Sequence, residues 1–398
     1  MVRSFRSFIL VLPLALVLVL TTIGSAVARE AIALGLSIDP VDHRDQNMVR
    51  LDRLIENRGF KPAIWTTWSN WGSRGENEEC LPDVGRCAFP SETVAALFER
   101  GITPFIWWQP AAPPGKARGD FARYVHTIEG RHDDYIREWA AAAAALDGDI
   151  LVRYAHEMNG RWYPWGITRF DNSPGRYVRA WRHIWRIFQE EGATNVKWVW
   201  APSREGCKGC EPNYAYESFY PGNRYVDYVA LSSYNQAKRR WRTMASLLEK
   251  PMARMRQMTR SPAFPNGKPV ILDEVGTVHI GGSKAAWLRD GYNEVFRRWP
   301  RVKAIVYFDV NMTKRNKRHP DWRLRYPADG SAMDAYASLA AMPRFKGKIG
   351  KTPKRSPQEP PQELPEASQP GLSEEPTQEL PEASRSGLME VIPEDEPS

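Results

Sequence analysis

The densest group of chemically reactive side chains follows an apolar run in the stretch Ile150–Gly166. The run begins Ile-Leu-Val and has the composition of a β-strand. The polar and aromatic residues of the stretch are Arg153, His156, Glu157, Asn159, Trp162, Tyr163 and Trp165. A carboxylate, an imidazole and tryptophans at the C-terminal end of a strand are typical of a catalytic group at the mouth of a barrel. Indole rings also suit a sugar ligand, because the C–H faces of pyranose rings stack on them.

Two further carboxylates, Asp273 and Glu274, follow the apolar residues in the segment Lys268–Thr277. Hydrolysis of a glycosidic bond usually takes two carboxylates, one that protonates the leaving oxygen and one that acts as nucleophile or base. Glu157 fits the acid, provided that apolar walls and a neighbouring carboxylate raise its pKa. Alternation along a strand sends Asp273 and Glu274 to opposite faces, so the pattern leaves the choice between them open.

Short apolar runs alternate with segments of helical period along most of the chain, which predicts repeated βα units. The expected strands are Ala31–Ile38, Pro62–Trp68, Thr103–Gln109, Ile150–His156, Val196–Ala201, Val226–Ser232, Pro269–Asp273 and Lys303–Phe308. The expected helices are Asn47–Asn57, Glu92–Arg100, Asp133–Leu146, Gly175–Glu190, Thr243–Met258, Ala285–Arg298 and Ala332–Ala341.

Eight strands with intervening helices predict an α/β fold of the (β/α)8 TIM-barrel type. A doubly wound open sheet is the alternative, but the loop after the first strand, Asp39–His43, lacks the Gly-rich phosphate signature of that fold. In a barrel, the ends of the fourth and seventh strands face each other across the mouth. Glu157 and the Asp273–Glu274 pair should therefore meet there.

The two ends of the 398-residue chain differ from its body. Residues 1–28 combine Arg3 and Arg6, an apolar stretch and a small-residue Ala26-Val27-Ala28 site, which predicts a cleaved signal peptide and an exported protein, secreted or periplasmic. Residues 29–345 are expected to form the barrel domain. Residues 346–398 are rich in Pro and Glu, repeat an eleven-residue unit, and predict a disordered tail.

The four cysteines form two close pairs, Cys80 with Cys87 and Cys207 with Cys210. In an exported chain two local disulfides are the expected pairing, and a redox pair or a zinc site are weaker alternatives. A zinc-protease motif is excluded at His156, because it needs a second histidine four residues later and position 160 is Gly.

The formal net charge is +8, although residues 351–398 carry eleven acidic and only four basic side chains. The body is therefore strongly basic, which suits either a solubilising surface or an anionic polysaccharide partner. Export and the absence of a recognition motif argue against nucleic acid. We expect a monomer with no membrane span once the signal peptide has been cleaved.

The sequence His-Glu-Met-Asn-Gly-x-Trp at 156–162 resembles the acid/base motif of glycoside hydrolase family 26, whose best-known members are endo-β-1,4-mannanases. The resemblance covers roughly residues 31–342 and implies a retaining (β/α)8-barrel glycosidase with no metal or organic cofactor. In the family the nucleophilic glutamate is followed closely by glycine, as in Glu274-Val275-Gly276. Glu274 is therefore the expected nucleophile and Glu157 the acid/base.

The resemblance also implies roles for residues around the two acids. Its implied substrate-binding or positioning residues are Arg153, His156, Trp162 and Tyr234. Trp165 joins them as a wall of the acid's pocket, and either Trp107 or Trp108 could form a platform for a sugar. We take Trp108 as the candidate. The last strand offers Tyr307-Phe308 where relatives commonly have tryptophan.

The leading functional hypothesis is a secreted retaining endo-glycosidase that acts on a β-linked polysaccharide, with β-1,4-mannan as the first candidate. Mixed-linkage β-1,3/1,4-glucan, β-1,3-xylan and bacterial exopolysaccharide are alternatives within the family. A non-catalytic polysaccharide-binding barrel is an alternative of another class, but a pure binder has no need of two opposed glutamates.

Overall fold

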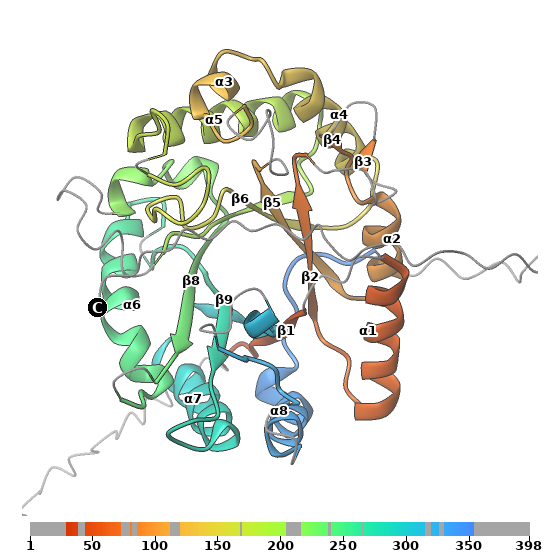
Figure 1. Ribbon diagram of the computed structural model, residues 1–398, viewed down its shortest axis with the longest axis vertical. Coiled ribbons are helices and arrows are strands. Elements are labelled where there is room, and N and C mark those ends of the chain that lie inside the picture. Colours follow the sequence, from red (N-terminus) through yellow and green to blue (C-terminus); the bar gives the residue numbers. More distant parts are fainter. Residues whose placement is uncertain are drawn as a thin grey trace, which may run out of the picture.

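The computed structural model describes residues 29–38, 44–72, 80–81, 86–111, 120–167, 169–203, 216–237, 240–264, 266–314, 320–325 and 330–353. A closed barrel of parallel strands occupies the centre, with helices around its outside (Figure 1). Its strands are β1 (Ala33–Ile38), β2 (Ile64–Asn70), β5 (Thr103–Gln109), β6 (Ile150–Tyr154), β7 (Val196–Trp200), β8 (Tyr228–Asn235), β9 (Val270–Thr277) and β10 (Val302–Asp309). The strands follow one another around the ring in chain order, and β10 closes on β1. The predicted (β/α)8 barrel is confirmed.

The helical layer matches the predicted helices within a few residues at each end. It contains α1 (Arg44–Arg58), α2 (Ser91–Glu99), α4 (Asp133–Ala144), α5 (Pro174–Glu190), α6 (Met244–Thr259), α7 (Lys284–Arg298) and α8 (Ser331–Ala341). Sequence patterns did not predict the five-residue helix α3 (Tyr124–Ile128) or the small hairpin of β3 (Cys80–Leu81) and β4 (Arg86–Cys87). Both are too short to show a period.

Strand alternation divides the buried side chains into two layers. Side chains such as Ile64, Phe105 and Leu151 fill the barrel interior, whereas their neighbours along the strands pack outward against the helices. The residues of the interior layer vary in size from Ala33 to Trp107. This packed interior leaves the ends of the strands as the place where polar groups can gather.

The barrel domain extends beyond the predicted boundary at residue 345, and the prediction that residue 346 begins the tail is wrong. Gly347 donates its backbone N–H to the carbonyl of Ile32, and the side chain of Ile349 is buried in the interior layer. Thr103 donates its hydroxyl to the carbonyl of Ile349, and Lys351 bonds both backbone and side chain of Asp149. Residues 346–351 thus belong to the fold because they satisfy backbone groups at the barrel's end.

The remaining terminal predictions fall on residues outside the described ranges, namely the signal peptide at 1–28 and the repeat region beyond 353. Within the described part of the chain, no helix is both long enough and apolar enough to cross a membrane. Cys87 is disulfide-bonded and lies opposite Cys80 in the hairpin. Cys207 and Cys210 lie outside the described residues.

Candidate active site

The end of β6 brings Arg153 and Glu157 to the mouth by an unusual backbone path. Within the strand, alternation turns Arg153 inward, on the same side as Leu151 in the interior layer. Ala155 and Glu157 then adopt positive φ angles of 43° and 50°. Left-handed backbone costs roughly 1–3 kcal/mol for a residue other than glycine and persists only where the surroundings impose it. Here the N–H of Glu157 donates to the carbonyl of Ala201 at 2.7 Å, which anchors the turn to the end of β7.

The carboxylate of Glu157 is held by two donors. The indole Nε1 of Trp162 donates to its Oε2 at 2.7 Å, and the hydroxyl of Ser232 donates to its Oε1 at 3.2 Å. Burial, followed by repulsion from Glu274, raises the pKa of Glu157 to about 7, although the Trp162 hydrogen bond opposes the rise. A carboxyl group with such a pKa retains its proton near neutral pH and can donate it.

Strand β9 departs from regular alternation at Asp273 and Glu274. Ala230 and Ser232 of β8 pair with Ile271 and Glu274, so β9 has one extra residue over this step. The same shift occurs against β10, between Leu272 and Val275. A bulge of this kind turns two successive side chains to one face. The expectation that Asp273 and Glu274 point to opposite faces is therefore wrong.

Arg153 forms ion pairs with both of these carboxylates from the interior of the barrel. Its guanidinium makes ion pairs with Asp273 Oδ2 and, at 2.7 Å, with Glu274 Oε1. It also lies 3.6 Å from the ring centroid of Trp107. All of these side chains are buried, and an unpaired charge there would be costly. Burial raises the pKa of Asp273, and its ion pair with Arg153 opposes that rise.

Tyr234 completes the surroundings of Glu274. Its hydroxyl donates to Glu274 Oε2 at 2.5 Å, so each oxygen of this carboxylate has a partner. Ser232 lies on the same strand, pairs in register with Glu274 and donates to Glu157. This serine therefore contacts Glu157 from a position opposite Glu274 in the neighbouring strand. Sequence patterns did not identify Ser232, because a serine in a strand gives no distinguishing signal.

His156 and Trp165 form a layer behind the acids. His156 is buried, and burial followed by the charge of Arg153 lowers its pKa well below the ordinary value, so its ring is neutral. Its carbonyl accepts a hydrogen bond from the indole of Trp165 at 2.8 Å. Trp165 is also fully buried, and its ring stacks on that of Tyr163 with centroids 4.5 Å apart. Trp165, expected as a wall of the acid's pocket, is buried and supports His156 and Tyr163.

Of the two adjacent tryptophans on β5, the structure places Trp107 inside the barrel and Trp108 outside it. Trp108 is buried among the helices, stacks on Trp139 with centroids 4.3 Å apart, and does not reach the mouth. The choice of Trp108 as a sugar platform is therefore wrong. Trp107 stacks with Trp68 and, nearly parallel at 7°, with Phe308. Alternation from Arg153, which pairs in register with Trp107, could have identified the inward residue.

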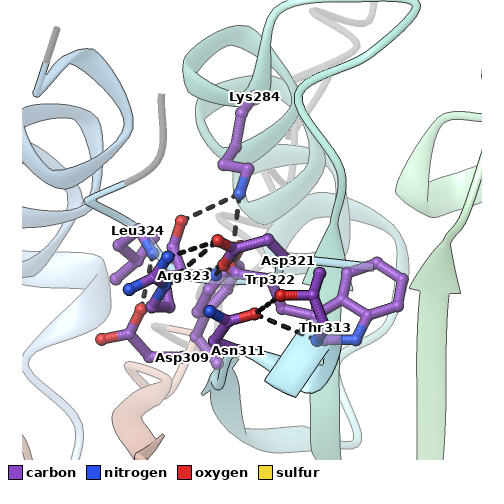
Figure 2. A network of polar contacts seen from close by, with 9 residues as sticks. Lys284, Asp309, Asn311, Thr313, Asp321, Trp322, Arg323 and Leu324 are labelled. Carbon is purple, nitrogen blue, oxygen red and sulfur yellow. Dashed lines mark hydrogen bonds and ion pairs between the residues drawn. The ribbon is translucent and has the colours of Figure 1, made fainter. Parts of the chain in front are cut away.

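The segment after β10 supplies a wall behind Tyr234. The ring of Trp322 lies 4.8 Å from that of Tyr234 and would contact any side chain at Gly276. Figure 2 shows how this segment is held: Lys284 at the start of α7 reaches the carbonyls of Trp322 and Arg323 at 3.3 and 2.9 Å. Asp309 accepts the N–H of Leu324 in the same network. The network fixes Trp322, and through it the position of Tyr234.

Comparison with known proteins agrees with this geometry. Residues 130–276 match the model of glycosyl hydrolase family 26, and this range contains Glu157 and Glu274. Over this range the chain is similar to glycosyl hydrolase family 26. The chain is 32% identical over 244 residues to "Endoglucanase H" of Acetivibrio thermocellus, covering 61% of this chain and 24% of that protein.

A second relative is a "Mannan endo-1,4-beta-mannosidase" of Bacillus subtilis, 33% identical over 210 residues, covering 47% of this chain and 55% of that protein. The chain therefore spans between about a quarter and about half the length of these curated relatives. Among solved structures, a β-mannanase from Bacteroides ovatus has a TM-score of 0.53 and 18% identity over 80% of this chain and 90% of that one. A Bacillus subtilis mannanase has a TM-score of 0.51 at 17% identity, covering 78% of this chain and 85% of that one. These structures support the barrel fold.

Proposed function

We propose that this protein is a retaining glycoside hydrolase that cleaves a β-linked polysaccharide, with Glu157 as acid/base and Glu274 as nucleophile. The observation that carries the proposal is the contrast between the two carboxylates. Glu157 has a pKa of about 7 and is suited to hold a proton. Glu274 is paired with the cation of Arg153 and with the hydroxyl of Tyr234, which suits a charged nucleophile. Unequal environments of this kind are what the two roles require.

The reaction would proceed in two displacements. In the first, Glu274 attacks the anomeric carbon while Glu157 gives its proton to the departing glycosidic oxygen. In the second, the Glu157 carboxylate takes a proton from a water molecule. That water attacks the same carbon and releases Glu274. Retention of configuration requires carboxyl groups about 5–5.5 Å apart. The hydrogen bond from Ser232 to Glu157, together with the register of Ser232 with Glu274, supports such a short separation.

Several neighbouring side chains would assist the reaction. Trp162 donates to Glu157 while that group is charged, and so steadies it between the two steps. Tyr234 and Arg153 orient Glu274 for attack and stabilise it as the leaving carboxylate of the second step. The neutral ring of His156 has an Nδ1 atom without a hydrogen-bond partner among the described residues, and it is suited to orient substrate near the acids.

The proposed first substrate is β-1,4-mannan, because similar proteins carry the name of mannan endo-1,4-β-mannosidase. The similarity to a protein named as an endoglucanase makes a β-glucan the leading alternative. β-1,3-Xylan and acidic exopolysaccharide are further candidate substrates, the latter because the body of the chain is basic. A screen of reducing-sugar release from mannan, glucomannan, lichenan, xylan and acidic exopolysaccharides would rank them.

The decisive experiment replaces each acid by its amide. Glu157→Gln and Glu274→Gln should each lower turnover by several orders of magnitude, with little change in thermal unfolding. Glu129→Gln, which replaces an exposed carboxylate paired with Arg131, is the matched control. Azide should restore a Glu274→Gly enzyme and give a glycosyl azide of inverted configuration. A protein that binds polysaccharide and shows no turnover would favour the non-catalytic alternative.

We also propose that the protein is exported and acts as a monomer. Cleavage after Ala28 would leave a mature chain that begins near Arg29, the first described residue. N-terminal sequencing of protein recovered outside the cytoplasm tests the cleavage site, and light scattering tests the oligomeric state.

A further inference from the structure

Three potential metal ligands surround the short helix α3, and none of them contacts the carboxylates of the proposed reaction. Asp120 precedes the helix, His126 lies within it and His132 follows it. One ligand atom from each residue lies within 4.8 Å of the other two. Two histidines with one carboxylate are a donor set that zinc accepts in proteins, in contrast to the all-oxygen sets of calcium and magnesium.

The separations of the side-chain ligand atoms, from 2.8 Å up to at most 4.8 Å, bracket those around a tetrahedral ion. His126 Nδ1 lies 2.8 Å from Asp120 Oδ1 and 3.0 Å from the backbone oxygen of the same residue. His132 Nε2 lies 3.4 Å from that backbone oxygen. Zinc bonds of about 2.0–2.1 Å in a tetrahedron separate neighbouring ligand atoms by roughly 3.3 Å. Small side-chain rotations would therefore bring these atoms around one ion.

The ring of His132 is not satisfied by the protein alone. The side chain is fully buried, Nδ1 has no hydrogen-bond partner among the described residues, and the contact of Nε2 is long. Buried polar atoms in native proteins normally have a close partner, so the long contact of Nε2, which faces Asp120, leaves this atom available to an ion.

The surroundings fix the rings and leave access for an ion. Phe121 and Trp71 pack against the ring of His132, with centroids 5.3 and 5.5 Å away. The side chain of Asp120 is about half exposed, which leaves the edge of the cluster open to water. The nearby charge of Arg86 opposes a cation, and the carboxylate of Asp120 offsets it.

We propose that Asp120, His126 and His132 form a structural site for a zinc ion. The ion would tie together the two ends of α3 and the residues that follow it. Tyr124 in α3 donates its hydroxyl to the carbonyl of Trp165 at 2.6 Å, and Trp165 supports His156. Zinc would thus stabilise the segment that underlies the acid/base residue. This inference does not depend on the proposed hydrolase activity, since its test is metal content and stability.

The test uses the purified full-length mature protein, with any affinity tag removed. After chelation and dialysis, zinc is added and metal content is measured by elemental analysis. We expect one zinc per chain and, at a hundredfold excess over Kd, a rise in Tm of about 5 °C. Cobalt in the same site should give the visible bands of a tetrahedral ion with nitrogen and oxygen ligands. Absence of bound zinc in the wild-type protein would overturn the proposal.

Two variants at the more accessible ligands locate the ion. Asp120→Asn and His126→Gln should each abolish stoichiometric zinc and the rise in Tm. His183→Gln is the matched control, because His183 pairs with Asp133 outside the cluster and should retain both. Equal zinc affinity in Asp120→Asn, His126→Gln and wild type would place the ion elsewhere and refute the site. Thiolate-to-cobalt charge-transfer bands would also refute it, since they would indicate cysteine ligands.

Discussion

Trp162 donates its indole N–H to Oε2 of Glu157 at 2.7 Å, and this hydrogen bond stabilises the charged form of a carboxyl group that burial drives toward neutrality. The balance between burial, the charge of Glu274 and this donor leaves the pKa of Glu157 at about 7. This hydrogen bond joins Trp162 to Glu157, five positions earlier in the same sequence motif. It also makes the pH dependence of the reaction a test of the site.

Trp162→Phe should extend activity to higher pH. An acid with a pKa of about 7 is protonated below that pH, so activity of the wild type should fall as pH rises through 7. Loss of the indole donor should raise this pKa by about one unit, since hydrogen bonds to charged groups contribute about 1.5–3 kcal/mol. The pH profile of kcat measures the shift. A basic limb that stays in place or moves to lower pH would contradict the assignment of Glu157.

Tyr234→Phe should reduce kcat about a hundredfold, with a smaller change in KM. The variant removes the hydroxyl that donates to Glu274 at 2.5 Å but keeps the ring that packs against Trp322 and Phe308. Loss of one donor to a reacting oxyanion typically costs about 10²–10³-fold in rate. Steady-state kinetics together with thermal unfolding test this, and a variant with wild-type kcat would exclude a role for Tyr234.

Arg153→Leu should destabilise the fold by about 3–5 kcal/mol, because it leaves Asp273 and Glu274 buried without their cation. The double variant Arg153→Leu/Asp273→Asn removes one of the two orphaned charges and should recover part of the loss. Urea unfolding at pH 7 measures the free energies of all three proteins. If the double variant were less stable than Arg153→Leu, the ion pair with Asp273 would not be the source of the effect.

The Glu157→Gln variant should differ from the wild type in the pH dependence of its stability. The folded pKa of Glu157 lies above the ordinary value of a glutamate, so the folded protein holds this proton more tightly than the unfolded chain. Stability from this group is present below about pH 4.5 and is lost as pH rises through about 7. The wild type should therefore lose stability relative to Glu157→Gln over that interval, and denaturant unfolding at several pH values measures the difference.

Two C-terminal truncations should separate the packed segment from the tail. A chain that ends at Pro353 keeps the burial of Ile349 and both contacts of Lys351, and its Tm should equal that of the full chain. A chain that ends at Lys346 loses these contacts and should lose about 2–5 kcal/mol, the usual cost of removing a buried aliphatic side chain. Equal stability of the two truncations would show that residues 347–353 contribute little.

The sequence predicted much of the barrel because its signals are local. Apolar runs of strand length and helical periods specify elements within a few residues, and the regular alternation of the two determines the fold class. The pairing of Glu157 with Glu274 was also predictable, because the C-terminal ends of parallel barrel strands all lie at one mouth. The wrong predictions concern features that neighbouring strands determine. The bulge at Asp273, which turns this residue and Glu274 to one face, is an example.

The sequence by itself determined the (β/α)8 fold, and it pointed to Glu157 and Glu274 as candidate acids with Arg153 and Tyr234 near them. Only the tertiary structure decided that Trp107 and not Trp108 faces the interior, because one residue of register inverts the direction of every side chain in a strand. It also decided that Ser232 contacts Glu157 and that Ile349 belongs to the core. Such contacts form between segments that are far apart in the sequence, and no local sequence pattern predicts which of these segments come together.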